Sequence, residues 1–504
     1  MCAEPEDDSA NPAMTISQNY HLVLSLDEAV RLLATHGARA RVIAGATDLL
    51  IELERKQRTG IDVLIDLTKV SGLDSIVLAA DGWIHLGPLV THNDACASAL
   101  IQARALPLAQ ACWEVGAPQI RNRATVAGNL ITASPANDTI TPLIALGAVL
   151  RLRSLARGDR QVALEDFYTG VRRTVMEADE LLVDIAFPAM KPNECGVFIK
   201  LGLRRAQAIS IANVAIMLCM SGATEQASRS VSNVRVALGS VAPTIVRARL
   251  TEASLENKVL SDEAIDAACE LAQASVTPIS DIRAPADYRL AMVGTLVRRA
   301  LEAIRNDDVR RTLPTAPVLL ATITQESHTQ HLRSYGSQEI EMTINGQSRI
   351  FSIVHHKTLL RMLREDADLQ GTKEGCAEGE CGACCVILNG KAVMSCLVPA
   401  RAAKDSVIQT VEGLSNHPIH AKMQKAFVDE AAVQCGYCTP GFLMAGAMLL
   451  DERAIIDRDA AEQAFAGNLC RCTGYFKILD AVVRTAERRS SDGLAGVADR
   501  GVNE

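Results

Sequence analysis

Lys and Arg are absent from the first 30 positions of this 504-residue chain, and aromatic residues make up only 3% of it. A secretory signal peptide needs a basic start followed by an apolar stretch, so the absence of both predicts a cytoplasmic protein. No run of 18 apolar residues occurs, which argues against a membrane span. With so few aromatics, the cores must consist mainly of Ala, Val, Leu and Ile, and the hydrophobic content of 48% is sufficient for this.

An excess of positive charge is also missing. The formal net charge is −8 and the sequence pI is about 5.8, so nucleic acid is not expected as a partner. Seven of the 15 cysteines are scattered without a pairing pattern, as in proteins of a reducing compartment, where a buried Cys acts as a small hydrophobic residue. They are Cys2, Cys96, Cys112, Cys195, Cys219, Cys269 and Cys385.

The other eight cysteines form two sets of four near the C-terminus. The first set has the C-x4-C-x2-C spacing and distant fourth Cys of a plant-type [2Fe–2S] ferredoxin, rather than the repeated C-x2-C of structural zinc sites. Its members are Cys376, Cys381, Cys384 and Cys396. The second set ends in C-x-C, and its spacing alone leaves iron–sulfur and zinc both open. Its members are Cys435, Cys438, Cys470 and Cys472.

The sequences around these cysteines resemble a known family. The C-x4-C-G-x-C segment, QCGYCTPG and NLCRCTGY are similar to the two-cluster iron–sulfur module of the xanthine dehydrogenase, or molybdenum hydroxylase, family, over residues 339 to 488. The resemblance implies a β-grasp ferredoxin domain followed by a four-helix domain, each with one [2Fe–2S] cluster. It also implies that the first cluster lies nearer the flavin and the second nearer the molybdenum cofactor, with Gln434 and Cys472 beside the pterin of a partner.

The N-terminal half has an α/β pattern. Ser25 and Glu28 form a capping box before a helical segment, and ARVIAG predicts a strand that leads through residues 44–48 into a helix from Leu49 to Arg55. A second small-residue turn is expected at residues 125–129 and a polar loop at residues 134–138. Such strand–turn–helix junctions can bind phosphate through backbone amides, but they also occur without any ligand.

The segments AGATD, IRNRATVAGN, ASPAND, DELLVDIAFP and FIKLGLRR occur in an order that resembles the FAD-binding medium subunit of carbon monoxide dehydrogenase and the flavin portion of xanthine dehydrogenase. Ala46 and Ala127 stand where that family often has Gly, which predicts a modest change in geometry. The residues implied to contact FAD are Val42, Ile43, Ala44, Gly45, Ala46, Thr47, Asp48, Leu49, Thr125, Val126, Ala127, Gly128, Asn129, Asp138, Leu182 and Lys200.

These patterns predict an α+β multidomain protein. The expected parts are a tail (1–14), an FAD-binding α/β domain of two subdomains (15–190), a flavoprotein C-terminal α+β domain (191–310), an exposed linker (311–337), a β-grasp plant-type [2Fe–2S] ferredoxin domain (338–412), a four-helix [2Fe–2S] domain (413–488) and a second tail (489–504).

The function implied by the resemblance is that of an electron-transfer subunit in a heteromeric oxidoreductase. A separate large molybdopterin-binding catalytic subunit, a dimer of heterodimers, and NAD or another electron acceptor are expected. Xanthine, another purine or another N-heterocycle leads as substrate, with an aldehyde or carbon monoxide as alternatives. Two rival hypotheses are a self-contained flavin oxidoreductase, which needs an acid or base over the flavin, and a non-enzymatic iron–sulfur sensor.

Overall fold

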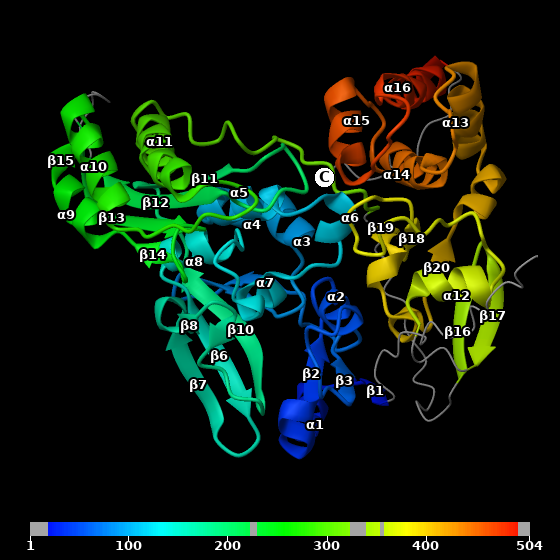
Figure 1. Ribbon diagram of the computed structural model, residues 1–504, viewed down its shortest axis with the longest axis horizontal. Coiled ribbons are helices and arrows are strands. Elements are labelled where there is room, and N and C mark those ends of the chain that lie inside the picture. Colours follow the sequence, from blue (N-terminus) through cyan, green and yellow to red (C-terminus); the bar gives the residue numbers. More distant parts are fainter. Residues whose placement is uncertain (1–18, 222–228, 323–338, 353–356, 492–504) are drawn as a thin grey trace, which may run out of the picture.

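The computed structural model describes residues 19–221, 229–322, 339–352 and 357–491. Its flavin-type half and its iron–sulfur-type half lie side by side (Figure 1). In the described part of the chain, no helix is long and apolar enough to cross a membrane. The predicted α+β multidomain class is confirmed. The predicted N-terminal tail and most of the C-terminal one lie outside the described residues, and helix α16 ends at Ser491.

The N-terminal domain has two subdomains. The first is a three-stranded parallel sheet in the order β1-β3-β2, with helices α1 and α2 between strands. The predicted Ser25 cap is present, because its side chain accepts a hydrogen bond from the Glu28 N–H. The elements of this first subdomain are β1 (Asn19–Leu22), α1 (Leu26–His36), β2 (Ala40–Ile43), α2 (Leu49–Glu54) and β3 (Val63–Asp66).

The second subdomain is a five-stranded antiparallel sheet in the order β4-β5-β10-β6-β7, covered by short helices. Its strands are β4 (Ile76–Leu78), β5 (Trp83–Leu86), β6 (Val149–Ser154), β7 (Gly158–Ala163) and β10 (Glu180–Pro188), with the small pair β8 (Tyr168–Gly170) and β9 (Arg173–Thr174). Its helices are α3 (His92–Ala97), α4 (Ala99–Arg104), α5 (Leu106–Glu114), α6 (Pro118–Arg121), α7 (Val126–Thr132) and α8 (Ile140–Leu146).

The next domain is a second antiparallel sheet, in the order β11-β12-β13-β14 with β15 beside β13. One apolar core joins residues of α5 and α8 to residues of this sheet and of the preceding one, so these helices lie between the two sheets. The elements are β11 (Glu194–Leu201), β12 (Ala212–Met220), β13 (Ser230–Gly239), β14 (Val246–Arg247), α9 (Arg249–Leu255), β15 (Lys258–Val259), α10 (Asp262–Ala274) and α11 (Ala286–Arg305).

The ferredoxin-like domain is a mixed five-stranded sheet in the order β17-β16-β20-β18-β19. The two predicted hairpins are present, and their turns, Asn345-Gly346 and Asn389-Gly390, have the positive φ angles that favour Asn and Gly. The elements are β16 (Glu339–Ile344), β17 (Gln347–Ser352), α12 (Leu359–Glu365), β18 (Cys385–Leu388), β19 (Lys391–Met394) and β20 (Val407–Gln409).

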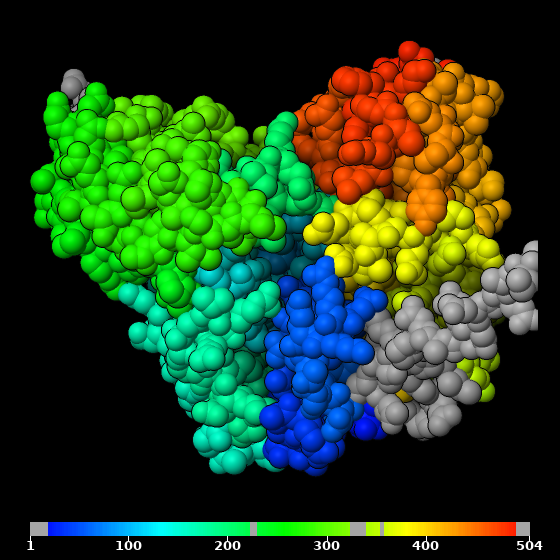
Figure 2. Space-filling model, viewed as in Figure 1, coloured from blue at the N-terminus to red at the C-terminus, as the bar shows by residue number. Residues whose placement is uncertain are grey.

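The last domain contains four α-helices around one apolar core. Their bounds are α13 (Pro418–Asp429), α14 (Thr439–Glu452), α15 (Arg458–Ala464) and α16 (Phe476–Ser491). Figure 2 shows this domain, orange to red, seated on the yellow ferredoxin-like domain, which itself lies beside the blue N-terminal domain.

One expectation about the linker is wrong. Residues 318–321 are not an exposed connector, because Val318 and Leu320 are fully buried in the core of the helical domain. The Glu452 carboxylate accepts hydrogen bonds from the N–H groups of residues 319–321, and Asn122 donates to the carbonyls of Leu319 and Leu320. Periodicity could not predict this, since a short apolar segment becomes buried only when two domains meet over it. Residues 323–337 of the predicted linker lie outside the described residues.

Candidate functional site

A cavity of about 690 Å³ lies between the two N-terminal subdomains and reaches the ferredoxin-like domain. Residues 44–49, between β2 and α2, and residues 127–129, at the start of α7, line it. Gly45 lets the first segment approach the backbone that leads into α7, since a Cβ at this position would lie 2.3 Å from the carbonyl oxygen of Arg123. The volume is within the range of small-molecule and cofactor sites, and closely approaching backbone is what a diphosphate requires.

Residues 125–129 are not a free turn, as the sequence suggested, but the N-cap and first turn of α7. The Thr125 side chain accepts a hydrogen bond from the Gly128 N–H at 3.0 Å. Asn129 accepts hydrogen bonds from the backbone and the hydroxyl of Thr139, and its own carbonyl accepts one from the Asn137 side chain. The polar loop that contains Asp138 is therefore fixed against α7.

Most of the predicted cofactor-contacting residues meet in this cavity. The lining includes Val42, Ala44, Gly45, Ala46, Thr47, Asp48, Leu49, Thr125, Ala127, Gly128, Asn129, Asp138 and Leu182. Three predicted residues do not line it. Ile43 and Val126 are fully buried in apolar cores, and Lys200 lies behind Asp138.

Lys200 and Asp138 form a buried ion pair. The Lys200 ammonium lies 2.6 Å from the Asp138 carboxylate and 2.9 Å from the Glu114 carbonyl oxygen, and its side chain is 3% exposed. Ser210 donates a second hydrogen bond to Asp138 at 2.7 Å. Burial raises the pKa of Asp138, and Lys200 opposes this shift. Lys200 therefore lies outside the cavity lining, whereas its partner Asp138 is part of it.

The two Ala residues at expected Gly positions differ in conformation. Ala46 has a φ of 67°, in the left-handed region where a Cβ is unfavourable. Ala127 is in the helix α7. Only the first substitution therefore places the extra methyl group on a strained backbone.

The iron–sulfur half contributes part of the cavity wall, which the sequence did not reveal. Gly379, Glu380 and Leu397 line the cavity together with Ile120 of the N-terminal domain. Gln207 donates a hydrogen bond to the Glu380 carbonyl oxygen at 3.1 Å. These residues lie far apart in the chain and have no common motif, so only the docking of the two halves brings them to one site.

The first cysteine set lies directly behind this wall. The Sγ atom of Cys376 accepts hydrogen bonds from the backbone N–H groups of Glu378 and Glu380, at 3.4 and 3.2 Å. A hydrogen bond from the Cys381 thiol and these backbone groups lower the pKa of Cys376 to about 5. Cys384 and Cys396 form a second close thiol pair in an apolar cluster with Leu397 and Ile120. Cysteines whose thiolate form is stabilised by backbone N–H donors of the same loop suit the binding of an iron–sulfur cluster.

Glycines make this loop possible. A Cβ on Gly375 would lie 2.7 Å from the Cys381 sulfur. Gly379 and Gly382 both have positive φ, and a Cβ on either would overlap a neighbouring residue. The backbone can therefore wrap closely around the four thiols.

The second cysteine set lies at the surface of the helical domain. Cys438 is the N-cap of α14, and Cys435 and Cys472 are exposed, with their sulfur atoms 3.6 Å apart. Thr473 donates from its hydroxyl to the Cys470 sulfur at 3.0 Å. All fourteen cysteines of the described residues are free thiols, so neither set forms disulfides there. Four convergent free thiols fit a second cluster.

The two cysteine loops contact each other. The Leu469 N–H, next to Cys470, donates to the carbonyl oxygen of Cys381 at 2.9 Å. Asn468 accepts a hydrogen bond from Gln119 of the N-terminal domain at 2.9 Å and donates to the Gly382 carbonyl oxygen at 3.3 Å. This buried junction joins the cavity domain and both cysteine loops.

Fold and site together define a flavin- and iron–sulfur-containing oxidoreductase chain, and four family models match it in succession. They are the FAD binding domain in molybdopterin dehydrogenase over residues 14–190, the CO dehydrogenase flavoprotein C-terminal domain over residues 198–304, the 2Fe-2S iron-sulfur cluster binding domain over residues 342–410, and the [2Fe-2S] binding domain over residues 410–483.

Characterised relatives match the two halves separately. The nicotinate dehydrogenase small FeS subunit of Eubacterium barkeri is 45% identical over 149 residues, which are 30% of this chain and 95% of that one. The carbon monoxide dehydrogenase medium chain of Hydrogenophaga pseudoflava is 34% identical over 284 residues, 56% of this chain and 96% of that one. A solved structure of carbon monoxide dehydrogenase from the same organism aligns with 60% of this chain and 99% of that chain, with 32% identity and a TM-score of 0.54.

The chain belongs to the molybdenum hydroxylase family of xanthine dehydrogenase and carbon monoxide dehydrogenase. It is an oxidoreductase subunit that combines FAD-binding and two [2Fe–2S] domains in one polypeptide, with the flavin module first.

Proposed function

We propose that this chain carries electrons from a molybdopterin-bearing catalytic subunit to NAD or another acceptor. The observation that supports this proposal is the linear order of the three sites. The loop of the plant-type set contacts both neighbours, because Gly379 and Glu380 line the cavity and the Cys381 carbonyl accepts a hydrogen bond from the Leu469 N–H beside Cys470. Bound [2Fe–2S] clusters exchange single electrons, and a bound flavin exchanges one or two.

We assign the cavity to FAD. The segments 44–49 and 125–129 would hold the diphosphate with backbone N–H groups, because both line the cavity and Gly45 packs closely on the backbone just before Thr125. Asp138 would hold a polar group of the nucleotide, and Lys200 would keep Asp138 ionised. Ile120 and Leu397 would exclude water between the cavity and the first cysteine set.

We assign the surface around Cys435 and Cys472 to the partner. Large side chains with more than half of their area exposed lie within four residues of these cysteines in sequence, and groups of exposed apolar side chains mark interaction surfaces. They are Tyr437, Leu469 and Phe476. Gln434 is exposed beside Cys435, as expected for a residue that meets the pterin of a second chain. From the family resemblance we also propose a dimer of such heterodimers.

A docking variant tests this assignment. Leu469→Glu places a charge on the proposed interface, whereas Leu250→Glu places one on a similarly exposed site of the flavoprotein C-terminal domain. Leu469 is 55% exposed and Leu250 is 64% exposed. With the large subunit co-expressed, Leu469→Glu should abolish co-purification and substrate-driven flavin reduction, and Leu250→Glu should not. Equal behaviour of the two variants would contradict the proposed interface.

The substrate is proposed by class only. We propose an N-heterocycle, with xanthine and other purines first. The 45% identity of the iron–sulfur half to a nicotinate dehydrogenase subunit agrees with this class, whereas the flavin half resembles a carbon monoxide dehydrogenase chain. The isolated chain should oxidise none of these substrates, and the assembled complex should oxidise one class. Turnover by the isolated chain would instead support a self-contained flavin oxidoreductase.

A further inference from the structure

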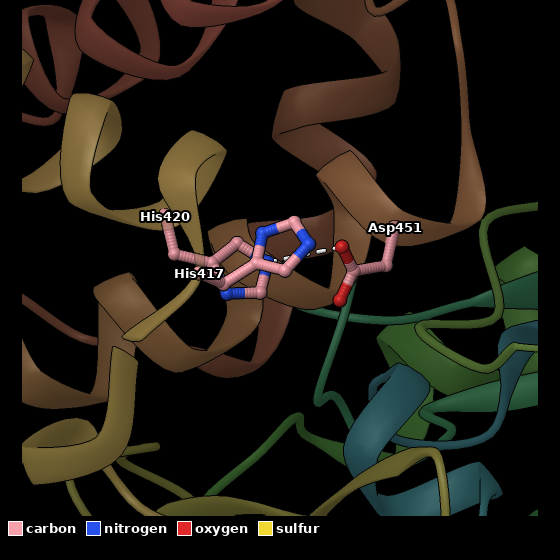
Figure 3. Close-up of side chains that lie close together, drawn as sticks. All are labelled: His417, His420 and Asp451. Atoms are coloured by element: carbon pink, nitrogen blue, oxygen red, sulfur yellow. Dashed lines mark hydrogen bonds and ion pairs between the residues drawn. The ribbon is translucent and has the colours of Figure 1, made fainter. Parts of the chain in front are cut away.

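Three side chains of metal-ligating types lie close together in the helical domain, at the opposite end of α14 from Cys438. His417 is the N-cap of α13, His420 lies in its first turn, and Asp451 lies near the end of α14. One potential ligand atom from each residue lies within 4.8 Å of the others. Figure 3 shows the two imidazole rings beside each other, facing the Asp451 carboxylate.

The hydrogen bonding of His420 is incomplete. The residue is only 2% exposed, and its Nε2 atom lies 3.0 Å from an Asp451 oxygen. Its other ring nitrogen, Nδ1, is buried and has no hydrogen-bond partner among the residues that the structure describes. The nitrogen that faces the Asp451 carboxylate, Nε2, is therefore the one available to an ion bound between these two side chains.

His417 completes the group from the solvent side. Its ring centroid lies 4.4 Å from that of His420, and a neutral imidazole is the form that binds metal. Two imidazoles and one carboxylate are ligands for zinc and similar transition metals, whereas Mg²⁺ and Ca²⁺ prefer oxygen alone.

We propose that His417, His420 and Asp451 bind one divalent transition-metal ion of the zinc class, with a water molecule at the remaining position. Ligands held at about 2.0–2.1 Å around a tetrahedral ion lie roughly 3.3 Å apart. The 3.0 Å between His420 and Asp451 therefore needs to widen only slightly, and a small rotation of the exposed His417 brings in the third ligand.

The position of the site indicates a structural role. Cys438 and Asp451 lie at opposite ends of α14, and 13 residues of helix correspond to about 20 Å. The ion would thus join the start of α13 to the end of α14 without contacting the cysteines. Glu452, the next residue, holds the N–H groups of residues 319–321 at the junction with the flavin half. Metal binding should therefore stabilise the attachment of the helical domain.

The test uses the full-length holoprotein with about four irons per chain, as expected for two [2Fe–2S] clusters. After dialysis against a chelator, Zn²⁺ is titrated by calorimetry, and bound zinc is counted by mass spectrometry. The wild type should bind one Zn²⁺ per chain, and His420→Gln and Asp451→Asn should each weaken binding at least about 100-fold. His21→Gln, at an exposed histidine in β1, is the matched control and should bind as the wild type does.

A second measurement follows thermal unfolding, so that a variant with altered folding is still informative. Zn²⁺ should raise the unfolding midpoint of the wild type and of His21→Gln, but not of His420→Gln or of Asp451→Asn. Mg²⁺ should have no effect on any of them. Absence of zinc binding by the wild type, or equal binding by wild type and both site variants with iron content unchanged, would overturn the proposal.

Discussion

Replacing Ala46 with Gly should stabilise the FAD-binding domain relative to the same replacement at Ala127. Both side chains are buried, 7% and 3% exposed, and each lies in an apolar core. Each substitution lowers the free energy of unfolding in two ways. It removes a buried methyl group that contributes about 0.8 kcal/mol, and the greater conformational entropy of Gly in the unfolded chain costs about 0.5–1 kcal/mol. These two losses are common to both variants and cancel in the comparison.

The contribution of the backbone conformation to the free energy of unfolding differs between the two sites and does not cancel. Ala46 has a φ of 67°, where a residue with a Cβ costs roughly 1–2 kcal/mol, whereas Ala127 is helical. Ala46→Gly removes that cost and Ala127→Gly removes nothing equivalent. The free energy of unfolding of Ala46→Gly should therefore exceed that of Ala127→Gly by about 1–2 kcal/mol.

The assay is thermal release of flavin from the holoprotein in excess FAD, followed by flavin fluorescence. For a domain of this size, 1 kcal/mol shifts the midpoint by about 2–4 °C, so the two variants should differ by roughly 2–8 °C. The FAD dissociation constant of each variant, measured separately, isolates any contribution from binding. An Ala46→Gly midpoint equal to or below that of Ala127→Gly would refute the strain argument.

Three further predictions concern the ion pair and the cysteine loops. Lys200→Met should destabilise the chain by about 3–5 kcal/mol at pH 8, because it leaves the buried Asp138 carboxylate unpaired. Burial raises the pKa of Asp138, so this loss of stability should shrink toward pH 5 as the carboxylate is protonated. Denaturant titrations should show that adding Asp138→Asn recovers stability. Cys381→Ser should lower the iron content from about four to about two per chain and remove one of two reduced-cluster EPR signals; loss of both signals in a folded chain would contradict independent sites. Gly382→Ala should loosen the contact between the two cysteine loops, because its Cβ would lie 2.4 Å from the Gly467 carbonyl oxygen. Limited proteolysis should then release the helical domain. An unchanged proteolysis pattern would show that the loop adapts to the added methyl group.

Local sequence determined the elements that depend on local chemistry. The turns Asn345-Gly346 and Asn389-Gly390 fixed two hairpins, because few other residues adopt positive φ at both positions. The Cys spacing alone predicted the plant-type loop, because four ligands within a short segment must surround one cluster. The loops at Gly45 and Thr125 were recognisable locally only as small-residue turns, and it was the family resemblance that implied that both contact one FAD.

Tertiary structure decided what depends on docking between the halves of the chain. The buried pairing of Lys200 with Asp138, which leaves Lys200 outside the cavity lining, could not be seen in the sequence. Residues 318–321 looked like an exposed linker and are buried, because two domains close over them. Gly379 and Leu397 joined the cavity only through the packing of the ferredoxin-like domain against Ile120. Periodicity and spacing report interactions between neighbours in sequence, whereas these contacts join residues more than 60 positions apart, whose meeting is determined by the packing of whole domains.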